Sequence, residues 1–457
     1  MNPKRSMLPL VVLLTSAAVA GCAARGAAAG AARAELSPRG AAADVTMGLV
    51  RDPALAAALG EVDAGRIRAT DSTLVAFGTR HTLSDTVSAT RGIGAARRWL
   101  HATLAGYARD CGGCLRVEYD TATVPLERLP GRPAAHLVNV LAWLPGRDTA
   151  RVVVIGGHYD SCICSLDRAD AASDAPGAND DASGTAAVVE LARVFSRRFP
   201  RGLHATVVFA LYAGEEQGLL GSTHLARRLH AEGRTVVAGM TDDIVGNVLS
   251  GDSAGHDPVR ADSTSVRIFA ADPDNGPSRE LGRYVWALAR LYTPDFTVVP
   301  VWRLDRLGRG GDHIPFQRLG DPALRFSERV EDWRRQHRPA DLFASVNPGY
   351  IARVARLNAA AVGALGLAPP PPDSVRAERA TLERVRGGQG WTLRWQAVPG
   401  ATGYEVLLRR TSAPTWERVL PAGPATSYDL AEQLDDLWAG VRSVGPDGQR
   451  SLVAGAP

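Results

Sequence analysis

The sequence predicts an α/β fold with a mainly parallel, mixed central sheet and helices on both faces, followed by a small C-terminal β-sandwich. Apolar runs of strand length alternate with helical segments between residues 46 and 366, and polar residues of metal-ligand type follow these runs. After a proline-rich stretch the pattern changes to short segments of period two, which is typical of antiparallel strands. The first two observations predict the sheet, and the third predicts the sandwich.

A βαβ unit is the clearest local signal. Residues 152–155 (VVVI) form a continuous apolar run, and residues 205–212 (ATVVFALY) form another, as expected of strands buried on both faces. Between them, residues 185–199 carry apolar side chains at helical spacing. This order indicates parallel strands, and ligand sites in such sheets lie beyond the carboxyl ends of the strands.

The chain of 457 residues is too long for one average domain. We divide it into a lipoprotein signal peptide (1–22), an Ala/Gly-rich tether (23–45), an α/β domain (46–366), a proline-rich linker (367–374) and a β-sandwich (375–457). In the last part, the spacing W-x-x-x-x-G-A-x-x-Y-x-V from Trp395 to Val406 resembles a fibronectin type III module. We expect a spacer or stabilising role for it; attachment to a polymer or a cell-surface partner is the alternative.

The N-terminus predicts export. Lys4 and Arg5 precede an apolar run over residues 7–19, which is too short to span a membrane and is typical of a signal peptide. The run ends in Val-Ala-Gly-Cys22, which resembles a bacterial lipobox, so Cys22 is expected to carry a lipid. A plain signal peptide cleaved nearby is the alternative. We therefore expect a protein anchored on the periplasmic side of the envelope, or secreted.

The composition favours a globular protein with a sizeable core. Hydrophobic residues make up 45% and charged residues 22% of the chain, and the formal net charge is +4. The arginines are dispersed among acidic residues, which favours a solvated surface over a basic stripe for nucleic acid. We expect no nucleic-acid partner, and we make no prediction of the oligomeric state.

Four cysteines besides Cys22 occur as two short pairs, Cys111-x-x-Cys114 and Cys162-x-Cys164. An even number in an exported protein favours disulfides, and a zinc knuckle is the alternative. The spacing does not determine the connectivity. A bridge at Cys162 or Cys164 would stiffen a loop close to the first of the motifs described next.

Five polar motifs stand at or after expected strand ends. They are GHYDS at 157–161, GANDDASG at 177–184, GEEQGLLGS at 214–222, DDIVG at 242–246, and the stretch 311–341 with DHIPF and RRQHRPAD. Neutral imidazole and carboxylate groups are zinc ligands, and a carboxylate near a ligating histidine orients it. Because the carboxyl ends of parallel strands lie at the same edge of a sheet, we expect these motifs to lie close together.

Each motif also has a structural interpretation. His158 alone is as consistent with a structural histidine, and Asp180 lies where a helix N-cap would stand. Glu215 and Glu216 form an adjacent acidic pair directly after a buried strand, which is costly unless a positive charge compensates it. A metal ion would provide that charge, and a solvated acidic turn is the alternative.

Taken together, the motifs resemble those of the co-catalytic zinc exopeptidases of clan MH, the family of bacterial leucyl aminopeptidase, aminopeptidase Y and glutamate carboxypeptidase II. The resemblance covers about residues 75–365. It implies two Zn²⁺ ions, peptide or protein substrates, and the following roles. One zinc would be held by His158 and Asp243 and the other by Glu216 and His337, with Asp180 bridging, Glu215 as general base and Asp160 orienting His158.

Two points stay open. His313 in the DHIPF motif is an alternative to His337 as the last ligand, although the carboxylate that follows His337 favours His337. The expected activity is that of an aminopeptidase. Carboxypeptidase activity, a glutaminyl cyclase, which shares DHIPF, and a non-catalytic binding protein of the same fold are the alternatives. The D-x-A-S-G and G-L-L-G-S continuations argue against a cyclase.

Overall fold

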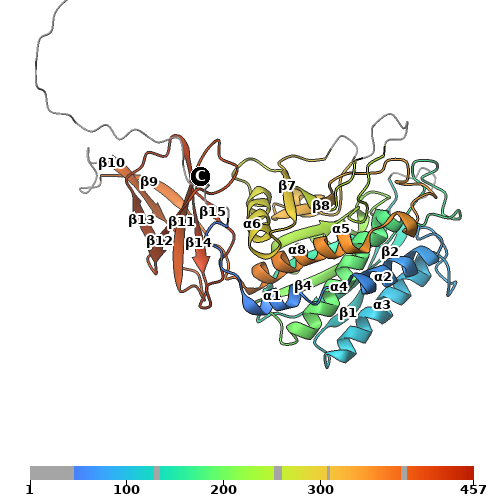
Figure 1. The fold of residues 1–457 in the computed structure, drawn as a ribbon. Coiled ribbons are helices and arrows are strands. Elements are labelled where there is room, and N and C mark those ends of the chain that lie inside the picture. Colours follow the sequence, from blue (N-terminus) through green and yellow to red (C-terminus); the bar gives the residue numbers. More distant parts are fainter. Residues whose placement is uncertain (1–45, 128–133, 252–259, 306–308, 382–388, 457) are drawn as a thin grey trace, which may run out of the picture. The chain divides into compact units, whose positions relative to one another are not determined.

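The computed structural model describes residues 46–127, 134–251, 260–305, 309–381 and 389–456 (Figure 1). The predicted signal peptide, the tether and Cys22 therefore lie outside the described residues. No helix within these ranges is both long enough and apolar enough to cross a membrane.

An eight-stranded mixed sheet forms the centre of the fold, in the order β1-β2-β4-β3-β5-β8-β6-β7. Its strands are β1 (Arg116–Pro125), β2 (Ala134–Leu144), β3 (Asp148–His158), β4 (Ala205–Tyr212), β5 (Thr235–Asp242), β6 (Ser265–Phe269), β7 (Thr297–Val301) and β8 (Ala323–Glu328). The four middle strands β4, β3, β5 and β8 are parallel neighbours, whereas β1, β2 and β6 pair antiparallel to their inner neighbours. The predicted mainly parallel, mixed sheet is confirmed.

Eight α-helices and two short helical turns are present in the described chain. They are α1 (Pro53–Leu59), α2 (Ala64–Ala76), α3 (Gly92–Asp110), η1 (Ala178–Ala182), α4 (Ser183–Arg198), α5 (Leu220–Ala231), α6 (Pro277–Tyr292), α7 (Ile314–Arg318), η2 (Phe343–Ser345) and α8 (Pro348–Leu367). The α4 and α8 helices pack against each other and against β3 and β4 (Figure 1).

Successive side chains of one strand serve two separate cores. In β3, Val153 and Ile155 belong to the large apolar cluster on the α4 side of the sheet. Val152 and Val154 belong to a second cluster that includes Leu225 of α5. Because the side-chain period of a strand is two, a continuous apolar run fills both faces. The prediction of helices on both faces is confirmed.

Residues after α8 form two antiparallel sheets. One has the order β13-β10-β9 and the other β12-β11-β14-β15. The strands are β9 (Arg376–Thr381), β10 (Gln389–Arg394), β11 (Gly403–Arg410), β12 (Arg418–Gly423), β13 (Ser427–Leu430), β14 (Leu437–Val444) and β15 (Ala454–Gly455). Leu393, Val406 and Val441 lie in one buried cluster to which both sheets contribute. The predicted small β-sandwich is present; its resemblance to a fibronectin type III module stays a prediction.

The sandwich shares buried contacts with α6. Trp416 and Leu452 belong to the large apolar cluster of the α/β domain. The Trp416 indole donates a hydrogen bond from Nε1 to Glu280 Oε2 at 2.7 Å. The described residues between 46 and 456 accordingly belong to one compact unit.

Candidate metal centre

The polar motifs meet at one edge of the sheet because the strands that carry them are parallel. The β3 strand ends at His158, and Asp243 directly follows β5. Glu215 and Glu216 follow β4, and His337 lies on the loop that leaves β8. The carboxyl ends of parallel neighbours lie at the same sheet edge, which is where this fold class places ligands.

Asp180 lies between two histidines. Its Oδ1 is 3.2 Å from His158 Nε2, and its Oδ2 is 3.0 Å from His337 Nε2. The short η1 segment before α4 carries Asp180 toward the sheet edge. The positive φ of Gly177 opens this segment, and a Cβ there would lie 2.4 Å from the main-chain oxygen of Asp180. Only glycine fits this turn.

Among the described residues, two groups of three side chains that include a histidine have the geometry to hold a metal ion. One consists of His158, Asp180 and Asp243, and the other of Asp180, Glu216 and His337. In the second group, Glu216 Oε2 is 3.1 Å from His337 Nε2, while Glu216 Oε1 is buried and has no hydrogen-bond partner among the described residues. Each group offers one imidazole and two carboxylates, a donor set that fits zinc and leaves a fourth position free for water or substrate.

Glu215 lines the same cavity as the two groups but belongs to neither. Desolvation raises the pKa of its carboxyl well above the usual range, although the charge on His158 opposes the shift. Its main-chain N–H donates to Asp160 Oδ1 at 3.2 Å, which fixes the start of the acidic pair. A carboxylate with a raised pKa beside metal-ligand candidates is suited to accept and release a proton.

Asp160 connects the first and third motifs. The Nδ1 atom of His158 is 3.2 Å from the main-chain oxygen of Asp160 and 3.6 Å from its Oδ1. The Asp160 carboxylate also accepts hydrogen bonds from the main-chain N–H groups of Glu215 and Glu216. Thus Asp160 is placed to orient His158, mainly through its carbonyl, and to hold the acidic pair through its carboxylate.

The two candidate histidines occupy different surroundings. His337 contacts Asp180 and Glu216, whereas His313 belongs to neither three-residue group. His313 is buried at the start of α7, and its Nδ1 has no hydrogen-bond partner in the described chain. Burial and the nearby Arg325 lower the pKa of His313 to about 3, so it is neutral.

Asp181 is a residue that the motifs did not single out. It is fully buried, and its Oδ2 accepts the main-chain N–H of His158 at 3.1 Å. Its Oδ1 accepts the N–H groups of Gly184 at 2.9 Å and Ile244 at 3.2 Å. One carboxylate therefore joins the end of β3, the start of α4 and the segment that follows β5.

Arg80 was also missed, because it lies far from the motifs in the sequence. Its buried guanidinium donates to the main-chain oxygens of Tyr159, Pro176 and Gly177 at 2.7, 2.6 and 2.9 Å. These carbonyls flank His158 and Asp180. Arg80 therefore fixes the loops that follow β3 and precede η1.

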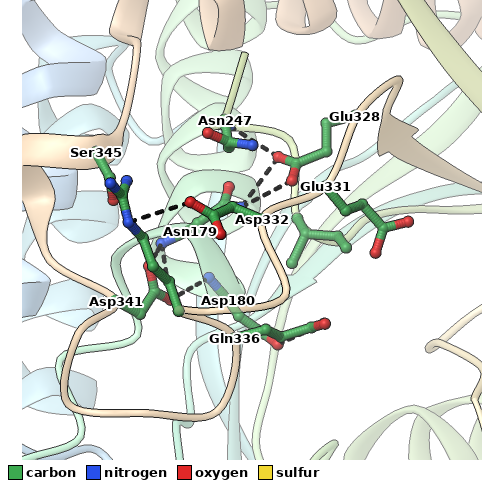
Figure 2. Close-up of a pocket in the computed structure, with 11 residues that line it drawn as sticks. Asn179, Asp180, Asn247, Glu328, Glu331, Asp332, Gln336, Asp341 and Ser345 are labelled. Carbon is green, nitrogen blue, oxygen red and sulfur yellow. Dashed lines mark hydrogen bonds and ion pairs between the residues drawn. The ribbon is translucent and has the colours of Figure 1, made fainter. Parts of the chain in front are cut away.

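A small polar cavity beside Asp180 shows how the η1 segment is held (Figure 2). The Asp341 carboxylate accepts the main-chain N–H groups of Asn179 and Asp180 at 3.0 and 2.9 Å. Asn179 Nδ2 donates to the two carboxylate oxygens of Glu328, at 3.1 and 3.0 Å. The carboxylate after His337 in the sequence thus positions Asp180 through its backbone.

The cavity over the metal-ligand candidates has a volume of about 750 Å³. Leu219 and Ile314 contribute apolar surface to it, and Arg168 and Arg325 contribute positive charge. Arg325 is buried, and its Nη1 lies 3.4 Å from Asp243 Oδ2, a contact that the sequence did not predict. The cavity is large enough for an amino-acid side chain and part of a peptide.

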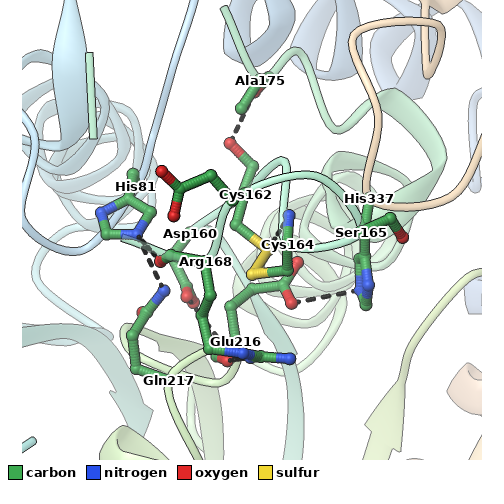
Figure 3. Close-up of a disulfide and its surroundings, with 12 residues drawn as sticks. His81, Asp160, Cys162, Cys164, Ser165, Arg168, Ala175, Glu216, Gln217 and His337 are labelled. Carbon is green, nitrogen blue, oxygen red and sulfur yellow. Dashed lines mark hydrogen bonds and ion pairs between the residues drawn. A yellow bond between two sulfur atoms is a disulfide. The ribbon is translucent and has the colours of Figure 1, made fainter. Parts of the chain in front are cut away.

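The structure pairs Cys111 with Cys114 and Cys162 with Cys164, which settles the connectivity that the sequence left open. The two pairs are disulfides and not the alternative zinc knuckle. The second disulfide lies beside Glu216 and His337 (Figure 3).

Comparisons with known proteins agree with this geometry. The model of peptidase family M28 matches residues 139–362. A probable zinc metalloprotease of Pyricularia oryzae is 39% identical over 437 residues, which is 88% of this chain and 84% of that protein.

Two solved structures share the fold at low sequence identity. The LapA aminopeptidase of Legionella pneumophila has a TM-score of 0.53 and 21% identity, over 72% of this chain and 78% of its own. The glutaminyl cyclase of Porphyromonas gingivalis has a TM-score of 0.51 and 18% identity, over 66% of this chain and 97% of its own. These two likenesses concern the fold alone. With its fold, its motifs and relatives that match most of its length, the chain belongs to peptidase family M28 and is a zinc metalloprotease.

Proposed function

We propose that this protein is an aminopeptidase that uses two zinc ions. His158 and Asp243 would hold one ion, Glu216 and His337 the other, and Asp180 would bridge them. The observation that carries this proposal is the position of Asp180, whose two oxygens face histidines of different groups at 3.2 and 3.0 Å. A carboxylate in that position supports two ions better than one.

When bound, zinc lowers the pKa of a coordinated water and polarises the scissile carbonyl. The chain's own residues move the proton. Glu215 accepts it from the attacking water and passes it to the nitrogen of the departing amine, so one carboxyl serves as base and then as acid. The Asp160 carboxylate holds Glu215 by accepting the main-chain N–H of Glu215. Asp181 and Arg80 hold the segments that carry the proposed ligands in place.

Support for an aminopeptidase comes from the LapA aminopeptidase, which has this fold, and from the cavity, whose apolar Leu219 and Ile314 suit an uncharged side chain. The glutaminyl cyclase that has the same fold makes cyclisation the main rival. We also propose, from the N-terminal sequence, that the enzyme is exported and held at the envelope through a lipid on Cys22.

The role of Glu215 is tested by Glu215→Gln. This change keeps the size of the side chain and removes its basicity, so zinc content should be unchanged while kcat falls by about 10²–10⁴-fold. Glu232→Gln, at the exposed end of α5, is the matched control and should behave as wild type. An undiminished rate in Glu215→Gln would exclude this residue as the base.

The substrate class is tested with aminoacyl-p-nitroanilides, the same compounds N-acetylated, and a peptide with N-terminal glutamine. An aminopeptidase releases nitroaniline from the free-amine compounds only. Mass spectrometry of the glutaminyl peptide then separates the rivals, because cyclisation loses ammonia and hydrolysis releases a free amino acid. Cleavage of the acetylated compounds at an equal rate would exclude recognition of a free amine.

A further inference from the structure

The Cys162–Cys164 disulfide lies against a side chain of the proposed zinc site. One donor atom from each of Cys162, Cys164 and Glu216 lies within 4.8 Å of the others (Figure 3). Cys162 and Glu216 are buried, with exposed fractions of 4% and 3%. This group is separate from the two groups that hold the histidines, although it shares Glu216 with one of them.

The two oxygens of Glu216 have different surroundings. Oε2 faces His337 Nε2 at 3.1 Å, whereas Oε1 is buried and has no hydrogen-bond partner in the described chain. Leaving a buried carboxylate oxygen without a donor is costly, so this atom is suited to a positive ligand. A carboxylate can offer one oxygen to each of two metal ions.

The loop that carries the cysteines is held by contacts that do not involve sulfur. Ser165 donates from its main-chain N–H to the carbonyl of His337 at 3.4 Å. The Arg168 guanidinium donates to the carbonyl of Glu216, and His81 Nε2 lies 3.1 Å from the carbonyl of Arg168. These contacts can persist after the S–S bond is broken, so both sulfurs would stay beside Glu216.

We propose that the reduced form of this pair is a binding site for a soft divalent cation such as Cd²⁺ or a further Zn²⁺, with Cys162, Cys164 and Glu216 Oε1 as ligands. A dithiol would reduce the pair: the S–S bond accepts two electrons and two protons, and the reductant closes its own disulfide. On binding, the cation displaces the protons from the two thiols. Thiolates select such soft cations over Mg²⁺ or Ca²⁺.

A cation at this site would share Glu216 with the proposed zinc pair, so turnover would fall when the site is occupied. The site itself does not rest on the proposed function, because its three donors lie together whatever reaction the enzyme performs. Cys111 and Cys114 provide an internal comparison. They form a disulfide of similar span, yet they belong to no group of metal-ligand side chains in the described residues.

The test measures Cd²⁺ binding through the ultraviolet thiolate-to-cadmium charge-transfer band. All proteins carry Cys22→Ser and Cys111→Ser/Cys114→Ser, so that Cys162 and Cys164 are the remaining cysteines. A phosphine reductant, which becomes a phosphine oxide with oxygen from water, is applied and removed under argon before titration. The oxidised protein should give no band, and the reduced protein should give a band that saturates at about one Cd²⁺ per chain.

Adding Glu216→Gln should weaken the reduced protein's Cd²⁺ affinity by about tenfold or more, because a ligand is replaced by a poorer donor. Adding Cys162→Ser/Cys164→Ser should abolish the band. A reduced protein that gives no band, or a band that survives the removal of both cysteines, overturns the proposal. An affinity that Glu216→Gln leaves unchanged overturns the part assigned to Glu216.

Reduction could also loosen the loop, so a second variant avoids it. Cys164→Ser in the same background leaves Cys162 as a free thiol beside Glu216 without any reductant. This protein should bind Cd²⁺ with a weaker charge-transfer band, and circular dichroism should match that of the oxidised parent. A folded Cys164→Ser protein without a band also overturns the proposal.

Discussion

The carboxyl edge of the central sheet and the contact between α6 and the sandwich both bury acidic side chains, but they compensate the charge differently. At the α6 contact, the buried Glu280 carboxylate pairs with Arg283 and accepts from Trp416 Nε1. Asp274, at the same contact, pairs with Arg283 at 2.7 Å and Arg409 at 2.8 Å. The acids here are matched by arginines.

At the sheet edge the balance is different. Six acidic residues converge there, namely Asp160, Asp180, Asp181, Glu215, Glu216 and Asp243. Arg325 lies 3.4 Å from Asp243, and the histidines that contact Asp180 are neutral when they bind metal. Arg80 is also buried near Asp160 and Asp181, so the acidic residues outnumber the nearby arginines. The remaining negative charge suits the divalent ions proposed above.

The difference separates a structural burial of charge from a functional one. A buried ion pair that is complete within the protein adds no reactive group, whereas an incomplete one needs a ligand from outside. Local charge balance thus supports the proposed metal site on grounds that do not depend on the sequence motifs.

Removing zinc should have the largest effect, because it leaves the sheet-edge carboxylates uncompensated. Activity should be lost completely, and stability should fall by about 4 kcal/mol for each bound ion, relative to protein with zinc at a thousandfold excess over Kd. Desolvation raises the pKa of Glu215, Glu216 and Asp243 in the metal-free protein. Raised pKa values favour the folded state below the unfolded-state pKa, and this contribution is lost as pH rises.

Thermal unfolding of chelated and zinc-loaded protein from about pH 5 to about pH 8 checks this prediction. The gap in Tm between the two forms should widen toward high pH. Readdition of zinc should restore both Tm and activity. Parallel curves for the two forms would show that the carboxylates are compensated without metal.

His337→Ala and His313→Asn compare the two candidate ligands. Loss of His337 removes a donor from the group with Asp180 and Glu216, so zinc content should fall by one ion and activity by about 10²-fold or more. His313 belongs to neither group, and His313→Asn should keep both ions. Metal analysis of the two purified variants decides between them, and loss of zinc in His313→Asn alone would reverse the assignment.

Arg283→Met tests the compensated region. The change leaves the Glu280 carboxylate buried without its cation, and no metal is available to replace it. The free energy of unfolding should fall by about 3–5 kcal/mol, as measured by chemical denaturation. The double change Glu280→Gln/Arg283→Met removes both charges and should cost less. Zinc content and activity at low temperature should stay unchanged in both variants.

The sequence predicted those parts of the fold and the site that depend on residues close together in the chain. The run 205–212 matches β4 residue for residue, and His158, Glu216 and Asp243 were found because each lies at the end of a strand or within a few residues of it. Arg80 and Arg325 were missed, because their partners are distant in the sequence. Arg80 contacts main-chain oxygens 79 and 97 residues away, and such acceptors leave no side-chain signature. The role of Asp181 was missed because it stands next to Asp180. The sequence does not show which way each of two adjacent aspartate side chains points, since that depends on the backbone conformation.

The smallest effect is expected at the exposed pair Arg418–Glu432 of the sandwich, whose side chains are 44% and 37% exposed. Water already compensates both charges, so breaking the pair should change stability by about 0–1 kcal/mol. A double-mutant cycle with Arg418→Ala and Glu432→Ala isolates the coupling, which should vanish at about 1 M salt, where the screening length is about 3 Å. A coupling as large as that of Glu280 with Arg283 would mean that burial is not what distinguishes the two kinds of pair. The charge argument for the proposed metal site would then lose its physical basis.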